Sequence, residues 1–183
     1  MQAGRPANPL NSGPLGMVGG AEVGGERVPR VLGEVRSSPM SDDEFWKLIA
    51  LIDREQLAGG DEDVAIEPLA SALASRPEDD LRGFEDVLAQ KLYALDGQRF
   101  AQEAGNSGGS DDAFLYARCW VVGSGKEHYH RVLATPRLMP KSLDEWLEPL
   151  LYVASNAYEK ATGEEWDHET PVSWETGSNE SEW

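Results

Sequence analysis

The sequence predicts an all-α protein, folded as a single compact bundle of six or seven helices with a disordered tail at each end. Three observations lead to this prediction. Apolar residues recur with a helical period throughout residues 40–163. Three serine–glutamate pairs in this region have the spacing of capping boxes, which mark helix starts. Forty of the 124 residues are large apolar residues or cysteine, which is enough for one core.

The first helix is predicted over residues 42–57. Ser41 and Glu44 form a capping box, in which each side chain bonds the other residue's backbone N–H. Starting from Phe45, apolar residues follow at i, i+3, i+4 and i+7, and two glycines at 59–60 end the helix.

Three further helices are predicted before the glycine-rich stretch in the middle of the chain. Pro68 is expected near the first turn of the second helix or at a kink in it. Ser75 and Glu78 form a capping box that opens the third helix. The predicted spans are 62–74, 77–94 and 97–104.

The second half of the domain holds the remaining predicted helices. Residues 105–109 are a loop by composition. Ser110 caps the next helix, and Ser142 with Glu145 opens the last one, which Pro149 restarts. The predicted spans are 111–123, 126–134 and 142–162, with Gly163 as the C-cap.

Both ends of the chain have compositions that predict disorder. Residues 1–39 hold eight Gly and five Pro and no aromatic residue, so they cannot bury enough apolar surface to offset the cost of ordering. Alternatively, Met40 is the true start and 1–39 is a mis-annotated leader. Residues 164–183 hold seven acidic and no basic residues but three tryptophans, and we expect an acidic disordered tail. Alternatively, those tryptophans dock on the core or bind a partner.

The charge of the chain limits its partners. The formal net charge is −17, from 33 acidic and 16 basic residues. Nucleic acids and anionic membrane surfaces are poor partners for such a chain, because binding phosphates needs a basic patch. No stretch is apolar and long enough to span a membrane, so we expect a cytoplasmic protein. The single cysteine excludes an internal disulfide and a cysteine-rich zinc module.

The most suggestive polar residues follow the glycine-rich loop. Asp111 and Asp112 come directly after Ser110, where the helix dipole favours negative charge. Adjacent helical side chains diverge by about 100°, so the two carboxylates do not converge on one point. They are either a good helix start or part of a polar site, which would suit a cation better than a phosphate.

Arg118 is predicted to share one helix face with Asp111 and Phe114. A buried arginine would need a carboxylate partner, supplied either by the protein or by a ligand. Cys119 is expected to be a small core residue, with a nucleophile as the alternative. The i, i+2 spacing of His128 and His130 does not suit helical zinc ligands, and we expect no metal and no cofactor.

A resemblance to a known family rests on these same residues. The stretch Gly108-Gly109-Ser110-Asp111-Asp112-x-Phe114-x-Tyr116-x-Arg118-x-Trp120, followed by Gly125-Lys126-Glu127-x-Tyr129, resembles the signature of the bacterial domain-of-unknown-function family 4240. The resemblance covers about residues 40–165 and includes the acidic Phe-Trp opening at 42–46 and a closing segment at 151–163. Ala113 and Ala117 depart from the usual pattern. The resemblance implies an all-helical bacterial domain and no established activity. It singles out Ser110, Asp111, Asp112, Tyr116, Arg118 and Trp120 as a candidate polar site.

Two classes of function follow from the sequence. No standard catalytic constellation is present, so we expect a non-catalytic acidic domain that binds a basic protein, as an inhibitor, adaptor or immunity-type protein does. The alternative is an enzyme or a small-ligand or metal-binding protein, with its site around Ser110, Asp111, Asp112, Tyr116 and Arg118. That alternative predicts that Asp112→Ala and Arg118→Ala abolish ligand binding and leave folding nearly intact.

Overall fold

The computed structural model describes residues 40–183, and all of its regular elements are helical. The expectations for residues 1–39 lie outside the described part of the chain. Within residues 40–183 there are eight α-helices. The predicted all-α fold class is therefore confirmed, and the predicted number of six or seven helices is slightly low. They are α1 (Asp42–Ile49), α2 (Arg54–Ala58), α3 (Glu62–Leu73), α4 (Glu78–Ala94), α5 (Gln98–Ala101), α6 (Asp111–Gly123), α7 (Lys126–Ala134) and α8 (Val153–Thr162). Four 3₁₀ helices join them: η1 (Gly105–Gly109), η2 (Pro136–Leu138), η3 (Glu148–Tyr152) and η4 (Glu180–Glu182).

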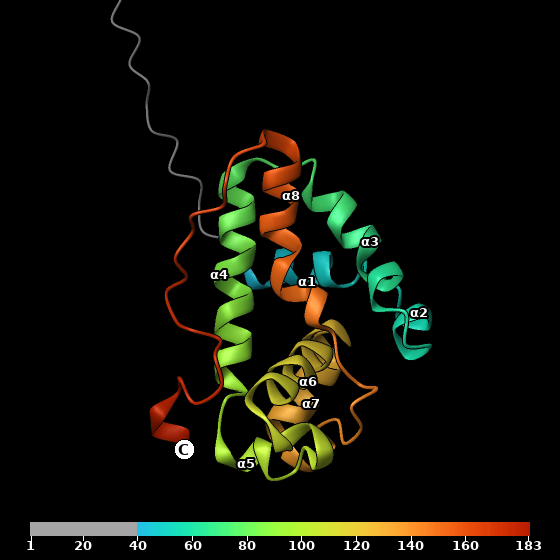
Figure 1. The fold of residues 1–183 in the computed structure, drawn as a ribbon, viewed down its shortest axis with the longest axis vertical. Helices are drawn as coiled ribbons and strands as arrows, with labels where there is room; N and C mark the ends of the chain where they lie inside the picture. The colour runs from blue at the N-terminus through green and yellow to red at the C-terminus, as the bar shows by residue number, and fades with distance from the viewer. Residues whose placement is uncertain (1–39) are drawn as a thin grey trace, which may run out of the picture. The chain divides into compact units, whose positions relative to one another are not determined.

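The helices pack around one apolar core. Helix α8 packs against both α3 and α4, and α6 packs against α4, α7 and η3 (Figure 1). Phenylalanines from four helices meet in the core and are almost fully buried: Phe45, Phe84, Phe100 and Phe114. Helix α6 has one face in the core and its N-terminal turn at the surface.

The first predicted helix is divided into two. Ser41 caps α1 as predicted, and its hydroxyl accepts the N–H of Glu44 at 3.2 Å. The helix then ends at Ile49. A new helix begins after Asp53, whose carboxylate accepts the N–H groups of Glu55 and Gln56 at 3.0 and 3.1 Å. A side chain that caps the next turn competes with continuation of the first helix.

Two predicted capping boxes do not cap helices. The Ser75 hydroxyl instead donates to the carbonyl of Ala72 at 2.9 Å, and α4 begins after Pro77 without a side-chain cap. The carboxylate of Glu145 accepts the backbone N–H groups at 141 and 142, but no helix follows. Pro149 lacks the N–H that would bond the carbonyl of Glu145, so the turn cannot propagate.

The segment 164–183 corrects the expectation of a disordered tail. It has little regular structure, yet it lies along α4 and is tied to it by side-chain hydrogen bonds (Figure 1). Trp166 packs on Tyr158 with ring centroids 5.0 Å apart, and Trp183 packs on Phe114 at 6.1 Å. Composition predicted disorder because aliphatic residues are scarce in this segment. Hydrogen bonds to α4 and packed aromatic rings hold the segment in place instead.

Candidate functional site

The predicted site residues lie on α6 and its N-cap, but they face different surroundings. The Ser110 hydroxyl accepts the N–H of Ala113 at 3.3 Å, so the predicted helix start is confirmed. Asp111 and Asp112 are exposed in the first turn. Arg118, two turns later, is fully buried. The structure therefore does not bring these residues together into one polar site.

Arg118 is held by the C-terminal segment. Its guanidinium donates to the carbonyls of Leu92 and Trp174 at 3.0 and 2.9 Å and to the hydroxyl of Thr176 at 2.9 Å. It also lies over the ring of Phe114, 4.9 Å from the centroid. Burial lowers the pKa of Arg118, and the negative charge of Asp96 opposes that shift. Two carbonyls and a hydroxyl accept the hydrogen bonds of Arg118, so the nearby carboxylate of Asp96 acts on it through its charge and not through a direct hydrogen bond.

Asp96 completes this anchor, although no motif or spacing in the sequence points to it. Its side chain is fully buried at the end of α4. It accepts four hydrogen bonds from the C-terminal segment, which come from the backbone N–H of Gly177 (3.1 Å), the backbone N–H of Asn179 (2.9 Å), the Ser178 hydroxyl (3.3 Å) and the Trp183 indole (3.0 Å). Buried charge is tolerated when hydrogen bonds saturate it. We call Asp96 and Arg118, with residues 174–183, the Asp96–Arg118 anchor.

A second anchor lies nearer the N-terminus of α4. The buried carboxylate of Glu85 accepts the indole N–H of Trp166 at 2.8 Å, and burial raises the pKa of Glu85. Arg82 donates to Nδ1 of His168 at 3.2 Å, so Nε2 carries the proton and donates to Asp86 at 2.7 Å. We call this the Glu85–Asp86 anchor. Both anchors hold structure, and among their guanidinium and carboxylate groups the only buried atom that lacks a hydrogen-bond partner within residues 40–183 is Nε of Arg118.

Cys119 and Trp120 also belong to the packed interior. The thiol of Cys119 is fully buried, and burial raises its pKa to about 12. A thiol that stays protonated at neutral pH is a poor nucleophile, so the core interpretation is the one the structure supports. Trp120 is half-buried and packs edge-on against His128, with ring centroids 5.4 Å apart.

The exposed face of α6 joins a surface of carboxylates and aromatic rings. Tyr116 packs edge-on against Trp146, with centroids 5.5 Å apart, and the Trp146 indole donates to Glu62 at the start of α3. Trp146 and Tyr152 are 37% and 46% exposed, which is unusual for such large rings. We define the acidic–aromatic surface by Glu62, Asp63, Asp112, Tyr116, Trp146, Glu148 and Tyr152.

The pKa shifts show that these groups lie within one electrostatic neighbourhood. Burial raises the pKa of Glu62, and the charges of Asp63 and Glu148 raise it further, against the Trp146 hydrogen bond. The pKa of Tyr116 is raised to about 12 by burial and then by Glu148 and Asp112. Negative potential therefore accumulates on this surface, which disfavours every further negative charge.

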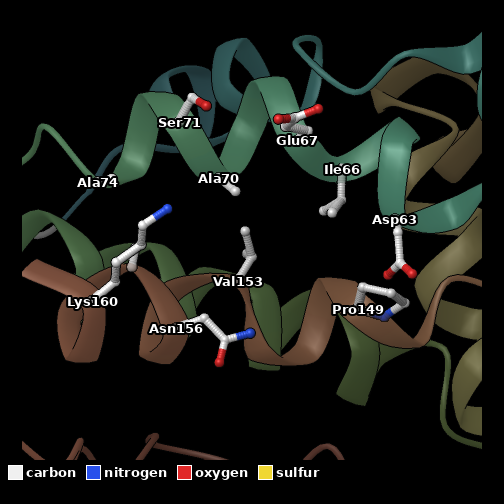
Figure 2. A pocket seen from close by; sticks show the side chains of 11 residues that line it. Asp63, Ile66, Glu67, Ala70, Ser71, Ala74, Pro149, Val153, Asn156 and Lys160 are labelled. Carbon is white, nitrogen blue, oxygen red and sulfur yellow. The ribbon is translucent and has the colours of Figure 1, made fainter.

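A groove of about 490 Å³ between α3 and α8 continues this surface. Figure 2 shows Ala70 of α3 and Val153 of α8 pointing toward each other across it, with Asp63 at one end and Lys160 at the other. Asp63 belongs to both the groove and the acidic–aromatic surface. The lining combines an apolar floor with a polar rim, which suits an apolar side chain of a partner.

Neither a metal-binding cluster nor a membrane-spanning helix is found among residues 40–183. Within 40–183, no group of three or more His, Cys, Asp or Glu side chains is arranged to hold a metal ion. His128 and His130 contact different rings, those of Trp120 and Trp46. Within the same residues, no helix has the length and apolar character needed to cross a bilayer.

Sequence reasoning found one half of the surface and missed the other. Asp112 and Tyr116 were selected through the helix start and the family motif. Glu62, Trp146 and Glu148 come from other segments, and nothing in their spacing places them beside α6. The one available signal is Trp146, an aromatic residue within the acidic run Asp144–Glu148.

Comparison with known proteins gives a family and nothing more specific. A family model described as "Protein of unknown function (DUF4240)" matches residues 40–160, which is most of the described chain. No curated protein and no solved structure matches the sequence. The matched region covers α1 to α7 and most of α8, and it includes the whole acidic–aromatic surface.

Proposed function

The chain belongs to the DUF4240 family, whose function is unknown, and we propose that it is a non-catalytic interaction domain that binds a basic protein partner. The acidic–aromatic surface is the binding surface in this proposal. One observation carries it: among the described residues, the carboxylates of Glu62, Asp63, Asp112 and Glu148 form no ion pair with any lysine or arginine, although they lie close to one another.

The observation is informative because these unpaired carboxylates raise the pKa values of a neighbouring carboxyl group and of Tyr116. Some acidic side chains elsewhere in the described chain take partners from within the protein, as Glu44 does with Arg76 at 2.7 Å and Asp86 does with His168, while others form no ion pair. On the acidic–aromatic surface no such cation is supplied. A partner that brings arginines or lysines would relieve the mutual repulsion of the carboxylates.

The exposed rings supply the second part of the interface. Tryptophan and tyrosine are enriched where binding energy is concentrated, because they bury much apolar area at a low cost in side-chain entropy. The faces of Trp146 and Tyr152 can also stack against a guanidinium. The adjoining groove between α3 and α8 accepts an apolar side chain beside Asp63.

We do not propose the alternative small-ligand site around Ser110, Asp111, Asp112, Tyr116 and Arg118. Such a site needs Arg118 as its cation, and all the hydrogen bonds of its guanidinium go to acceptors within the chain. Without Arg118, what remains is a capped helix start beside an acidic surface.

The test is affinity capture with the full chain as bait, compared across three forms. The test variant carries Glu62→Gln, Asp63→Asn, Asp112→Asn and Glu148→Gln. The matched control removes the same charge from exposed carboxylates outside the surface, through Glu159→Gln, Glu165→Gln, Glu169→Gln and Glu180→Gln. We expect the wild type and the control to retain a basic protein that high salt releases, because screening weakens the attraction between exposed charges.

The test variant is expected to lose that protein. Equal retention by the test variant and the control would contradict the proposed surface. A bound protein that is not basic, or that high salt leaves in place, would contradict the proposed class of partner. Circular dichroism of the three forms separates loss of binding from loss of fold.

A further inference from the structure

A second pocket, remote from the proposed function, lies where the end of α1 and the start of α2 meet the N-terminus of α7. Its volume is about 340 Å³. Residues from all three elements line it, among them Trp46, Arg54, Lys126, His128 and Arg131. The pocket therefore gathers basic side chains in a chain whose formal charge is strongly negative.

The charges in this pocket are only partly compensated by the protein. Three cationic side chains and one carboxylate, that of Glu127, line it. Lys126 pairs with Asp43 at 2.8 Å and with Asp42 at 3.4 Å. Among the described residues, Arg54 and Arg131 form no ion pair and no side-chain hydrogen bond, although acidic residues outnumber basic ones twofold. Two guanidinium groups are thus free to take a ligand.

The backbone at this point also favours an anion. Helix α7 begins after Gly125, and no side chain caps its first amide groups. Unsatisfied N–H groups and the helix dipole together attract negative charge at such an end. Gly125 has a φ of +97°, and a Cβ there would overlap the guanidinium of Arg54. Glycine is therefore favoured by the backbone conformation, and the guanidinium of Arg54 lies directly over it.

Two residues of the pocket lining, Trp46 and His128, each have a buried nitrogen that lacks a partner in the described chain. The indole Nε1 of Trp46 and the Nε2 of His128 are buried and have no hydrogen-bond partner within residues 40–183. Trp46 is only 6% exposed, and an indole N–H can only donate. Burial and the charge of Arg131 lower the pKa of His128, so its ring is neutral and can also donate through Nε2. Buried donors without an acceptor are rare in native proteins.

We propose that this pocket binds a phosphate group, through the guanidinium groups of Arg54 and Arg131 and the first amide groups of α7. A phosphate dianion carries two negative charges, one for each of the guanidinium groups that are unpaired within 40–183, those of Arg54 and Arg131. Lys126 is already paired with Asp42 and Asp43. Its three free oxygens accept more hydrogen bonds than a carboxylate can, and guanidinium forks fit them in pairs. Inorganic phosphate and the terminal phosphate of a small metabolite share this chemistry.

The experiment is isothermal titration calorimetry of the full chain with three probes: inorganic phosphate, ribose 5-phosphate and acetate. The test variant is Arg54→Gln with Arg131→Gln. The matched control is Arg137→Gln with Lys160→Gln, which removes the same charge from exposed side chains outside the pocket that also form no ion pair within 40–183. We expect saturable phosphate binding by the wild type and the control, and at least about tenfold weaker binding by the test variant.

Each outcome bears on the proposal. Tighter binding of inorganic phosphate than of ribose 5-phosphate assigns the pocket to the free ion, and the reverse assigns it to a phosphorylated metabolite. The proposal is overturned if neither phosphate probe saturates, if acetate binds as tightly as phosphate, or if the test variant binds like the wild type. The unliganded melting temperatures of the two variants should match that of the wild type, because the four side chains are exposed. This result is independent of the affinity capture, which concerns a different surface.

Discussion

Asp96 and Asp112 are carboxylates in contrasting surroundings, one buried and one exposed. Asp96 is fully buried and accepts four hydrogen bonds from the C-terminal segment. Asp112 is exposed on the acidic–aromatic surface, beside other carboxylates that no lysine or arginine of the described chain neutralises. The same contrast divides α6, where Arg118 is held within the fold and Tyr116 lies at the surface. A polar residue that the chain itself saturates is structural, and one that it leaves without a counter-charge is available to a partner.

The largest expected effect on stability comes from a substitution in the buried Asp96–Arg118 anchor. Arg118→Ala removes three hydrogen bonds and leaves Asp96 buried beside no compensating charge. We expect a loss of about 3–5 kcal/mol in the free energy of unfolding, measured by urea denaturation. Asp112→Ala is the matched control and should change that free energy by no more than about 0.5 kcal/mol. Similar losses from the two variants would show that the contrast is wrong.

A smaller effect is expected from weakening the anchor at its rim. Trp183→Ala removes the indole donor to Asp96 and the ring packed on Phe114. We expect a cost of about 1.5–3 kcal/mol, typical of a hydrogen bond to a charged group. Hydrogen exchange locates the loss, since the amides of Gly177 and Asn179 also donate to Asp96 and should exchange faster. Unchanged protection of these amides would mean that Trp183 does not contribute to the anchor.

The Glu85–Asp86 anchor gives a pH test. Burial raises the pKa of Glu85 in the folded state, so the folded protein binds a proton more readily than the unfolded chain does. Its contribution therefore falls as the pH rises from the unfolded pKa through the folded one. Glu85→Gln keeps an acceptor for the Trp166 indole and removes the charge. We expect a small gain in stability at neutral pH and a flatter pH dependence in that window. Denaturation curves across the acidic range that match the wild type would refute this sign.

The smallest expected effect is on the pKa of Tyr116, on the exposed acidic–aromatic surface. Asp112→Asn with Glu148→Gln removes two of the charges that raise the pKa of Tyr116 to about 12. The pKa should fall but stay above 10, because burial is the largest cause and is unchanged. Ultraviolet titration of tyrosinate, compared with a Tyr116→Phe control, measures the change. A Tyr116 pKa that does not move would place these charges farther from the ring than the structure does.

The fold was predictable from sequence where local signals decide it. The helix start at Ser110, the C-cap at Gly163 and the apolar face of α1 follow from residues close together in the chain. The division of the first helix depended on Asp53, whose capping of the next turn outweighed the apolar period. The family was identified correctly because its motif fixes polar as well as apolar positions.

The candidate site was predictable only in part, for a physical reason. Asp112 and Tyr116 lie on one helix, and their spacing is visible in the sequence. Glu62 and Trp146 reach them only through the packing of distant elements. The order of residues 164–183 was missed for the same reason. Composition reports apolar content, whereas Asp96 and Arg118 hold this segment by hydrogen bonds across about eighty residues and about fifty-six residues.

The two anchors on α4 also set how freely the chain between them can vary in length. Asp86 lies on α4 and Asp96 lies two residues beyond its end, so their separation of ten residues corresponds to about 15 Å at 1.5 Å per residue. Their partners His168 and Gly177 are nine positions apart, and the chain between them could span roughly 30 Å when extended. The connection is therefore slack. Residues added between 169 and 173 should leave both anchors in register, whereas removing more than about four would pull one of them apart.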